Sequence, residues 1–139
     1  MEITSNALQT VAQNQSVYFT STPIDGNCSI VHRDGSGLVT IKGITNQCRA
    51  RYKVYFGANI AVPTGQTVGP ISLAIAIEGE PIPPTTMTVT PAAVEEFFNV
   101  NSIVFIDVPR GCCNSISVRN ISTIPVEVQN ANLIVERVA

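Results

Sequence analysis

Along residues 51–60 the side chains alternate between two classes with a period of two. One class is Tyr52, Val54, Phe56 and Ala58, and the other is Arg51, Lys53, Tyr55, Gly57 and Asn59. Successive side chains of a β-strand point to opposite faces, whereas a helix of period 3.6 would mix the two classes. The pattern therefore predicts a strand with one face toward a core and the other toward solvent or a partner.

Short strands are expected along the rest of the chain as well. Stretches rich in β-branched and aromatic residues are separated by Gly, Pro, Asn and Asp, which favour turns. The Asp34-Gly35-Ser36-Gly37 turn predicts a hairpin, and the apolar run 71–77, with small residues at alternate positions, predicts a strand buried on both faces. The expected strands are 8–11, 16–20, 28–32, 38–42, 51–60, 71–77, 85–90, 102–108, 115–120, 124–129 and 132–138.

Two proline-containing stretches break the alternation. Each Pro lacks an amide donor, so Pro81-Ile82-Pro83-Pro84 is expected to cross between sheets or to run along an edge. Residues 91–98 hold the one candidate helical turn, since Pro91 suits the first helical position and two acids follow, but they could equally continue as strand. Short strands at this spacing predict that the chain is an all-β sandwich or barrel.

The length of 139 residues predicts one domain, residues 1–139, in which residues 1–14 could serve as an N-terminal arm. Only 13% of the residues are charged, against about 25% in an average soluble domain, so part of the surface is expected to be an interface. The net charge of −2 gives no general attraction for nucleic acid. No signal peptide is readable, and the most apolar run, 71–77, is far shorter than the roughly 20 residues of a membrane helix. We therefore expect synthesis in a cytoplasm and no contact with nucleic acid or membrane.

Four segments carry a family resemblance. They are Tyr52-Lys53-Val54-Tyr55-Phe56, the apolar strand and tight turn of residues 69–79, the turn and strand of residues 108–120, and the closing strand of residues 131–138. On these segments the chain from Arg51 onward resembles the tumour-necrosis-factor and complement-like superfamily, especially the C-terminal domains that follow collagen-like repeats in Firmicutes proteins. The resemblance implies a single-domain antiparallel jelly-roll β-sandwich that forms a homotrimer around a three-fold axis.

The chain departs from the collagen-linked members of that superfamily. It has no Gly-X-Y repeat, and Cys112 stands where an acid usually follows Gly111. Small proteins of this pattern are similar to capsid decoration or other head accessory proteins of Firmicutes phages, which implies a virion component made in the host cytoplasm. Its partner would be the major capsid protein or another virion lattice protein. The alternatives are a trimeric receptor- or glycan-binding module on a virion tail or fibre, and a bacterial spore or cell-surface protein.

The sequence offers little for catalysis. His32 is the single histidine, and no nucleophile, base or metal-ligand spacing accompanies it. It lies beside Arg33 in an expected strand, where a solvated or interface side chain is the ordinary interpretation, with ligand binding and a pH-sensitive contact as the rarer ones. We therefore expect no enzyme activity, no cofactor and no metal.

Four cysteines, Cys28, Cys48, Cys112 and Cys113, are interpreted first as buried thiols, because a reducing cytoplasm opposes disulfides. Cys112 and Cys113 are adjacent, so in a strand their side chains point to opposite faces and cannot form a simple mutual disulfide. A late disulfide from Cys28 or Cys48 to one of them is the alternative.

Arg49, Arg51 and Lys53 share one face of their strand and form a small cationic stripe. This stripe could bind a carboxylate or phosphate of a partner, although pairing with Glu95, Glu96 or Glu136 of the same assembly is favoured.

The preferred function is geometric: three copies pack through apolar strand faces, and loops or residues 1–14 bind a repeating lattice. The side chains expected to divide between the core and the trimer axis are Tyr52, Tyr55, Phe56, Ile71, Leu73, Ile75, Phe97, Phe98 and Phe105.

Overall fold

The computed structural model describes residues 1–26 and 28–139. The described residues form twelve strands and one 3-10 turn. The elements are β1 (Glu2–Ser5), β2 (Gln9–Val11), β3 (Ser21–Ile24), β4 (Ile30–His32), β5 (Val39–Lys42), β6 (Arg49–Ala61), β7 (Ile71–Ile77), β8 (Glu80–Pro81), η1 (Pro83–Thr85), β9 (Met87–Val89), β10 (Phe98–Pro109), β11 (Cys113–Asn120) and β12 (Val126–Arg137). The all-β prediction is confirmed, and no helix among the described residues has the length and apolar character needed to cross a bilayer.

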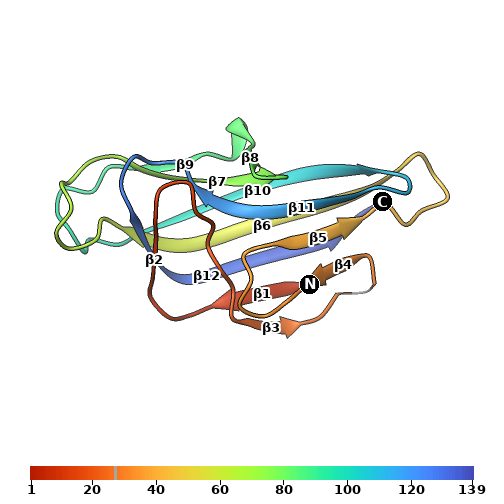
Figure 1. The fold of residues 1–139 in the computed structure, drawn as a ribbon, viewed down its shortest axis with the longest axis horizontal. Coiled ribbons are helices and arrows are strands. Elements are labelled where there is room, and N and C mark those ends of the chain that lie inside the picture. The colour runs from red at the N-terminus through yellow and green to blue at the C-terminus, as the bar shows by residue number, and fades with distance from the viewer. Residues whose placement is uncertain (27) are drawn as a thin grey trace.

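The strands form two antiparallel sheets that pack face to face, with the long strands running lengthwise (Figure 1). Sheet A has the order β10-β6-β12-β1-β3, and β2 also pairs with β12. Sheet B has the order β4-β5-β11-β7-β8, and β9 also pairs with β7. Strands from distant parts of the sequence are therefore neighbours in both sheets.

The core lies between the sheets and is filled by alternate residues of their strands. Every second residue of β6 from Ala50 to Ile60 is buried, which confirms the period-two prediction. Phe19 and Phe56 contact each other edge to face, with ring centroids 6.4 Å apart. The hydroxyl of Tyr52 donates to the carbonyl of Lys42 at 2.6 Å, so this buried aromatic keeps a polar partner.

Several local predictions are also confirmed. The Asp34–Gly37 turn joins β4 to β5 in an antiparallel hairpin. Strand β7 is buried along most of its length on both sides, and Pro81 belongs to the short edge strand β8. Residues 91–97 are different: they form neither the candidate helical turn nor a continued strand, since Glu95 has a φ of 58° and its amide donates to the carbonyl of Val62.

Within residues 1–14, β1 (Glu2–Ser5) and β2 (Gln9–Val11) belong to sheet A, so in the single chain this segment is part of the sandwich and not a separate arm. The amino group of Met1 donates to the carbonyl of Val135 at 2.7 Å, and β1 lies between β12 and β3. Ile3 is fully buried in the core, so releasing this segment would expose apolar surface.

The expected strand 16–20 is replaced by a crossing segment. The amide of Val17 donates to Val118 of β11, whereas that of Phe19 donates to Ser36 in the β4–β5 turn, so no continuous ladder forms. The regular strand starts at Ser21 and forms β3 at the edge of sheet A, where Pro23 is tolerated.

Candidate functional site

The outward side of sheet A combines side chains from its three longest strands. We call it the outer face of sheet A. Registers with β6 on both sides bring these residues together, as in the row Ile103, Tyr55, Ile134. Its members are Arg49, Arg51, Lys53, Tyr55, Gly57 and Asn59 of β6, Asn99, Asn101, Ile103, Phe105 and Asp107 of β10, and Glu127, Gln129, Asn132, Ile134 and Glu136 of β12.

The middle of this face is apolar and exposed. Phe105 is 62% exposed and Ile103 is 54% exposed, and Tyr55 lies next to Ile103. Ile24 of β3, at the opposite edge of the sheet, is 60% exposed. Single exposed apolar residues are ordinary, but several large ones on one sheet face indicate a surface that another molecule covers.

One end of the face carries an ion cluster centred on Asp107. Its carboxylate accepts from Nε of Arg49 at 3.1 Å and from Nε of Arg51 at 2.8 Å. The hydrogen bond from Arg51 and both positive charges hold the pKa of Asp107 below its usual value. Lys53 lies 4.0 Å from Glu136 on β12.

The predicted cationic stripe therefore exists, but its charges are paired within the chain. Pairing of Lys53 with Glu136 agrees with the favoured interpretation, whereas Arg49 and Arg51 bind Asp107, which sequence reasoning did not consider. The signal was present, because Asp107 follows the same alternation as Ile103 and Phe105. Only the pairing of β10 with β6 places it opposite Arg51.

The other end of the face carries a buried carboxyl group. Glu127 is 8% exposed, and burial together with the neighbouring Glu95 raises the pKa of Glu127 to about 7. A hydrogen bond with Glu127 and two with Thr64 lower the pKa of Glu95. One proton shared by this pair favours a neutral Glu127 and a charged Glu95.

Two buried side-chain oxygens of the described residues have no hydrogen-bond donor, Oε2 of Glu127 and Oδ1 of Asn132. Both belong to the outer face of sheet A. Buried polar atoms are nearly always paired in folded proteins, so two on one face indicate a surface that a ligand or partner completes.

The outward side of sheet B is different. Thr40, Lys42, Ser115 and Arg119 occupy its paired strands, and Ala74 and Ala76 are buried there. Arg119 donates to the carbonyl of Gly79. Val31 of β4 pairs with Thr40 and is 46% exposed, less than Phe105 and Ile103, so the outer face of sheet A is the stronger candidate for association.

The structure places the nine predicted core and axis residues in three locations. Buried in the core are Tyr52, Phe56, Ile71, Leu73 and Ile75. Tyr55 and Phe105 lie on the outer face of sheet A, whereas Phe97 and Phe98 are about one-third exposed where β10 begins.

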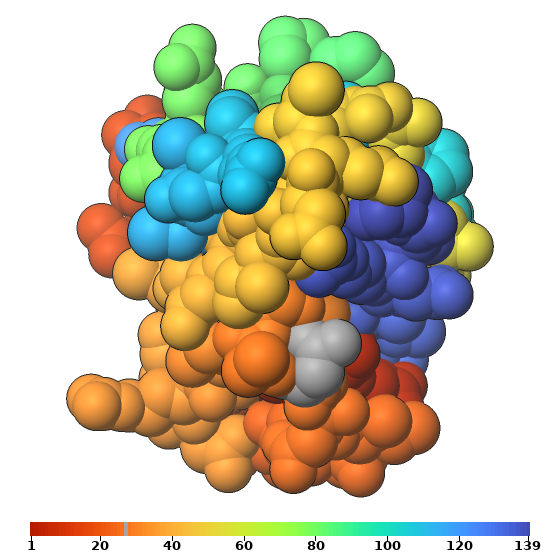
Figure 2. All heavy atoms as spheres, turned by 90° about the vertical axis from the view of Figure 1, so that its right-hand side faces the viewer, coloured from red at the N-terminus to blue at the C-terminus, as the bar shows by residue number. Residues whose placement is uncertain are grey.

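The four cysteines are free and exposed, which corrects the buried-thiol interpretation. Cys28, Cys48 and Cys112 lie in loops and Cys113 is the first residue of β11, all at one end of the sandwich. The backbone amide of Gly43 donates to the carbonyl of Cys112, and the backbone amide of Arg110 donates to the carbonyl of Cys48. Figure 2 looks onto this end, where the β10–β11 turn in blue adjoins the segment before β6 in yellow.

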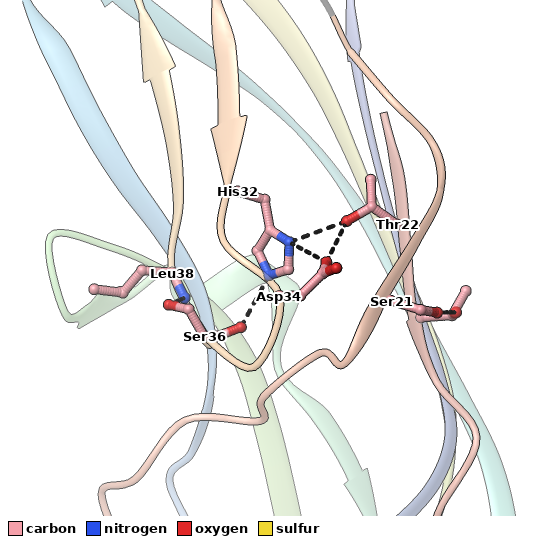
Figure 3. Close-up of polar contacts among 7 residues, drawn as sticks. Ser21, Thr22, His32, Asp34, Ser36 and Leu38 are labelled. Carbon is pink, nitrogen blue, oxygen red and sulfur yellow. Dashed lines mark hydrogen bonds and ion pairs between the residues drawn. The ribbon is translucent and has the colours of Figure 1, made fainter.

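His32 has a fully buried side chain, which corrects its interpretation as a solvated or interface residue. Nε2 lies 3.0 Å from the carbonyl of Ser36, and Nδ1 lies 3.4 Å from the hydroxyl of Thr22 and 3.8 Å from Asp34 (Figure 3). The Thr22 hydroxyl donates to Asp34 at 2.8 Å. These contacts link β3, β4 and the β4–β5 turn and occupy both ring nitrogens, so the imidazole is structural.

A scan of protein-family models finds no match to this chain, and neither does a search of curated proteins. Solved structures are similar to it in fold. The globular domain of zebrafish complement 1qA has a TM-score of 0.64 and 14% identity, covering 96% of this chain and 93% of its own. Eiger TNF from S. frugiperda has a TM-score of 0.69 and 12% identity, covering 100% and 92%.

Murine APRIL gives a similar result, with a TM-score of 0.64 and 9% identity over 97% of both chains. At such low identities the likeness concerns the fold and carries no function. The two-sheet topology and these neighbours agree, so the predicted fold is confirmed: the chain is an antiparallel jelly-roll sandwich, similar in fold to these solved structures.

Proposed function

We propose that this protein is a non-enzymatic, homotrimeric structural module of a virus particle, where it binds a repeating lattice of virion protein. The observation that carries the association is the exposed apolar centre of the outer face of sheet A. Removing apolar surface from water contributes about 25 cal/mol per Å², so covering Phe105, Ile103 and Tyr55 favours association.

A second copy of this chain is the occupant that the surface favours. Strand β10 is the edge of sheet A, and the edge of one copy can pack onto the outer face of sheet A in the next. Two different surfaces then meet, so the contact is head to tail, and such contacts form a ring when the rotation between successive copies closes. The ring size of three comes from the family resemblance of the sequence. Asp107 offsets one of the two arginine charges at one end, so the cluster of Arg49, Arg51 and Asp107 keeps a net charge of only +1.

Light scattering coupled to size-exclusion chromatography tests the trimer. We expect three times the chain mass of 14.8 kDa for the parent protein and the monomer mass for Phe105→Ser, with the fold retained because Phe105 is exposed. Leu38→Ser is the matched control, since Leu38 is 52% exposed and directly precedes β5 of sheet B, and this variant should remain trimeric. A monomeric parent at micromolar concentration, or a trimeric Phe105→Ser, would contradict the proposal.

The virion assignment rests on the similarity of the sequence to phage head accessory proteins, and the sparse charge of 13% suits a subunit covered by neighbours. Quantitative mass spectrometry of purified virus particles and of cell envelopes tests it. We expect hundreds of copies per particle. A few copies would instead indicate a receptor- or glycan-binding tip, and recovery only from envelopes would indicate a spore or cell-surface protein.

A further inference from the structure

His32 bridges the edge strands of the two sheets. It ends β4, at the edge of sheet B, and its ring reaches Thr22 of β3, at the edge of sheet A (Figure 3). The side chain is fully buried, and its ring contacts that of Phe19 edge to face, with centroids 6.4 Å apart. His32 is also the single histidine of the chain, so any titration of an imidazole belongs to it.

The nitrogen Nε2 of His32 carries a proton. Its neighbour at 3.0 Å is the carbonyl oxygen of Ser36, which can only accept a hydrogen bond. The same oxygen accepts from the amide of Phe19 at 3.2 Å, so a second bond also holds it in place. A neutral imidazole has one N–H group, and Nε2 therefore uses it.

The other nitrogen, Nδ1, faces two acceptors. The hydroxyl of Thr22 has one proton, which it donates to Asp34 at 2.8 Å, so its oxygen presents lone pairs to Nδ1 at 3.4 Å. A carboxylate oxygen of Asp34 lies 3.8 Å from Nδ1. A lone pair on Nδ1 finds no donor among these groups, whereas a proton there has two acceptors. The contacts therefore fit the imidazolium form better than the neutral one.

The charges around the ring favour the same form. Asp34, at 3.8 Å, is the acid that pairs with the imidazole in residues 1–26 and 28–139. The residues of β3 carry no charged side chain, nor does Val39, opposite His32 on β5, and the neighbouring Arg33 is exposed to solvent. An opposite charge at this range stabilises the protonated ring, against the cost of burying a cation.

We propose that His32 is a pH-sensitive latch that joins β3 to the β4–β5 turn. When Nδ1 holds a proton, the imidazolium donates to Oγ1 of Thr22 and attracts Asp34. When that proton leaves to solvent, the hydroxyl of Thr22 turns from Asp34 to Nδ1, and Asp34, whose side chain is 63% exposed, is left to water. The link is therefore stronger at acid pH and weakens as the pH rises and Nδ1 loses its proton. It lies within one chain, so it does not depend on the proposed trimer.

Nitrogen NMR of the imidazole, over about pH 5 to 9, tests the proton positions. We expect Nε2 to stay protonated throughout and Nδ1 to gain its proton as the pH falls. A neutral ring protonated on Nδ1 would overturn the proposal, because Nε2 would then face the carbonyl of Ser36 without a proton.

Variants test the role of the carboxylate. Asp34→Ser removes the charge and keeps a residue that suits a turn, and we expect half of His32 to be protonated at a pH about one unit lower than in the parent, a tenfold loss of proton affinity. Asp25→Ser is the matched control, since Asp25 is an exposed acid that also precedes a glycine, and it should leave the titration unchanged. An unchanged titration of His32 in folded Asp34→Ser would show that the carboxylate does not hold the proton and would refute the latch.

Hydrogen exchange tests the effect on the turn. The amide of Gly35 donates to the carbonyl of Phe19 at 2.7 Å, so its protection reports whether the turn stays closed. After correction for the intrinsic pH dependence of exchange, we expect this protection to fall about tenfold as His32 loses its proton, and to stay level in Asp34→Ser. Protection of Gly35 in the parent that does not follow the protonation of His32 would contradict the proposal.

Discussion

Individual residues on the outer face of sheet A are in unusual states for a surface. Glu127 is an acid that is buried beside another acid, and Asn132 keeps an oxygen without a donor while its Nδ2 donates to Glu2 at 3.0 Å. Neither state follows from residue type or strand period, because Glu and Asn at alternate positions normally indicate a solvated face. These residues mark the face as functional only once their surroundings are known.

Replacing Glu127 by Gln should stabilise the protein at high pH. The pKa of Glu127 is raised from 4.5 to about 7 in the folded state, so its contribution is fully present below pH 4.5 and is lost as the pH rises through 7. A neutral Gln avoids this loss, which we expect to be on the order of 2 kcal/mol. Urea unfolding at pH 5 and pH 8 measures it. Equal pH dependence in parent and variant would show that Glu127 is ionised without penalty.

At the scale of elements, periodicity located the long strands and the short strands β2, β4, β5 and β9, but it missed β1 and β3. Strand β6 follows from the alternation of residues 51–60 alone, and β12 runs continuously through two predicted strands because a bulge at Asn130, with φ 54°, preserves the pairing. The local sequence patterns of β1 and β3 are weak. These strands form because β1 pairs with β12 on one side and with β3 on the other. The register between β6 and β10, which builds the outer face of sheet A, is a long-range property that no local window contains.

Gly43 joins two elements, the end of β5 and the β10–β11 turn. Its amide binds the carbonyl of Cys112, and a Cβ at this position would collide with the carbonyl oxygen of Pro109. We therefore expect Gly43→Ala to lower the free energy of unfolding by about 1–3 kcal/mol, the usual cost of overpacking. Gly69→Ala is the control, because a Cβ there meets no atom within 4 Å. Thermal denaturation of both variants compares them, and equal melting temperatures would mean that the turn moves away freely.

In the whole molecule, the outer face of sheet A has an exposed apolar centre between two charged ends, and this arrangement predicts how the proposed trimer responds to solution conditions. Its association depends on apolar burial at Phe105 and Ile103, whereas the ion pairs of Asp107 are exposed and screened by salt. We expect the trimer to persist in about 1 M NaCl, where the Debye length is about 3 Å, and its melting temperature to rise with protein concentration. Light scattering and calorimetry over a concentration series measure both. Dissociation by salt would assign the association to charge pairs, and the apolar centre of the face would then need another occupant.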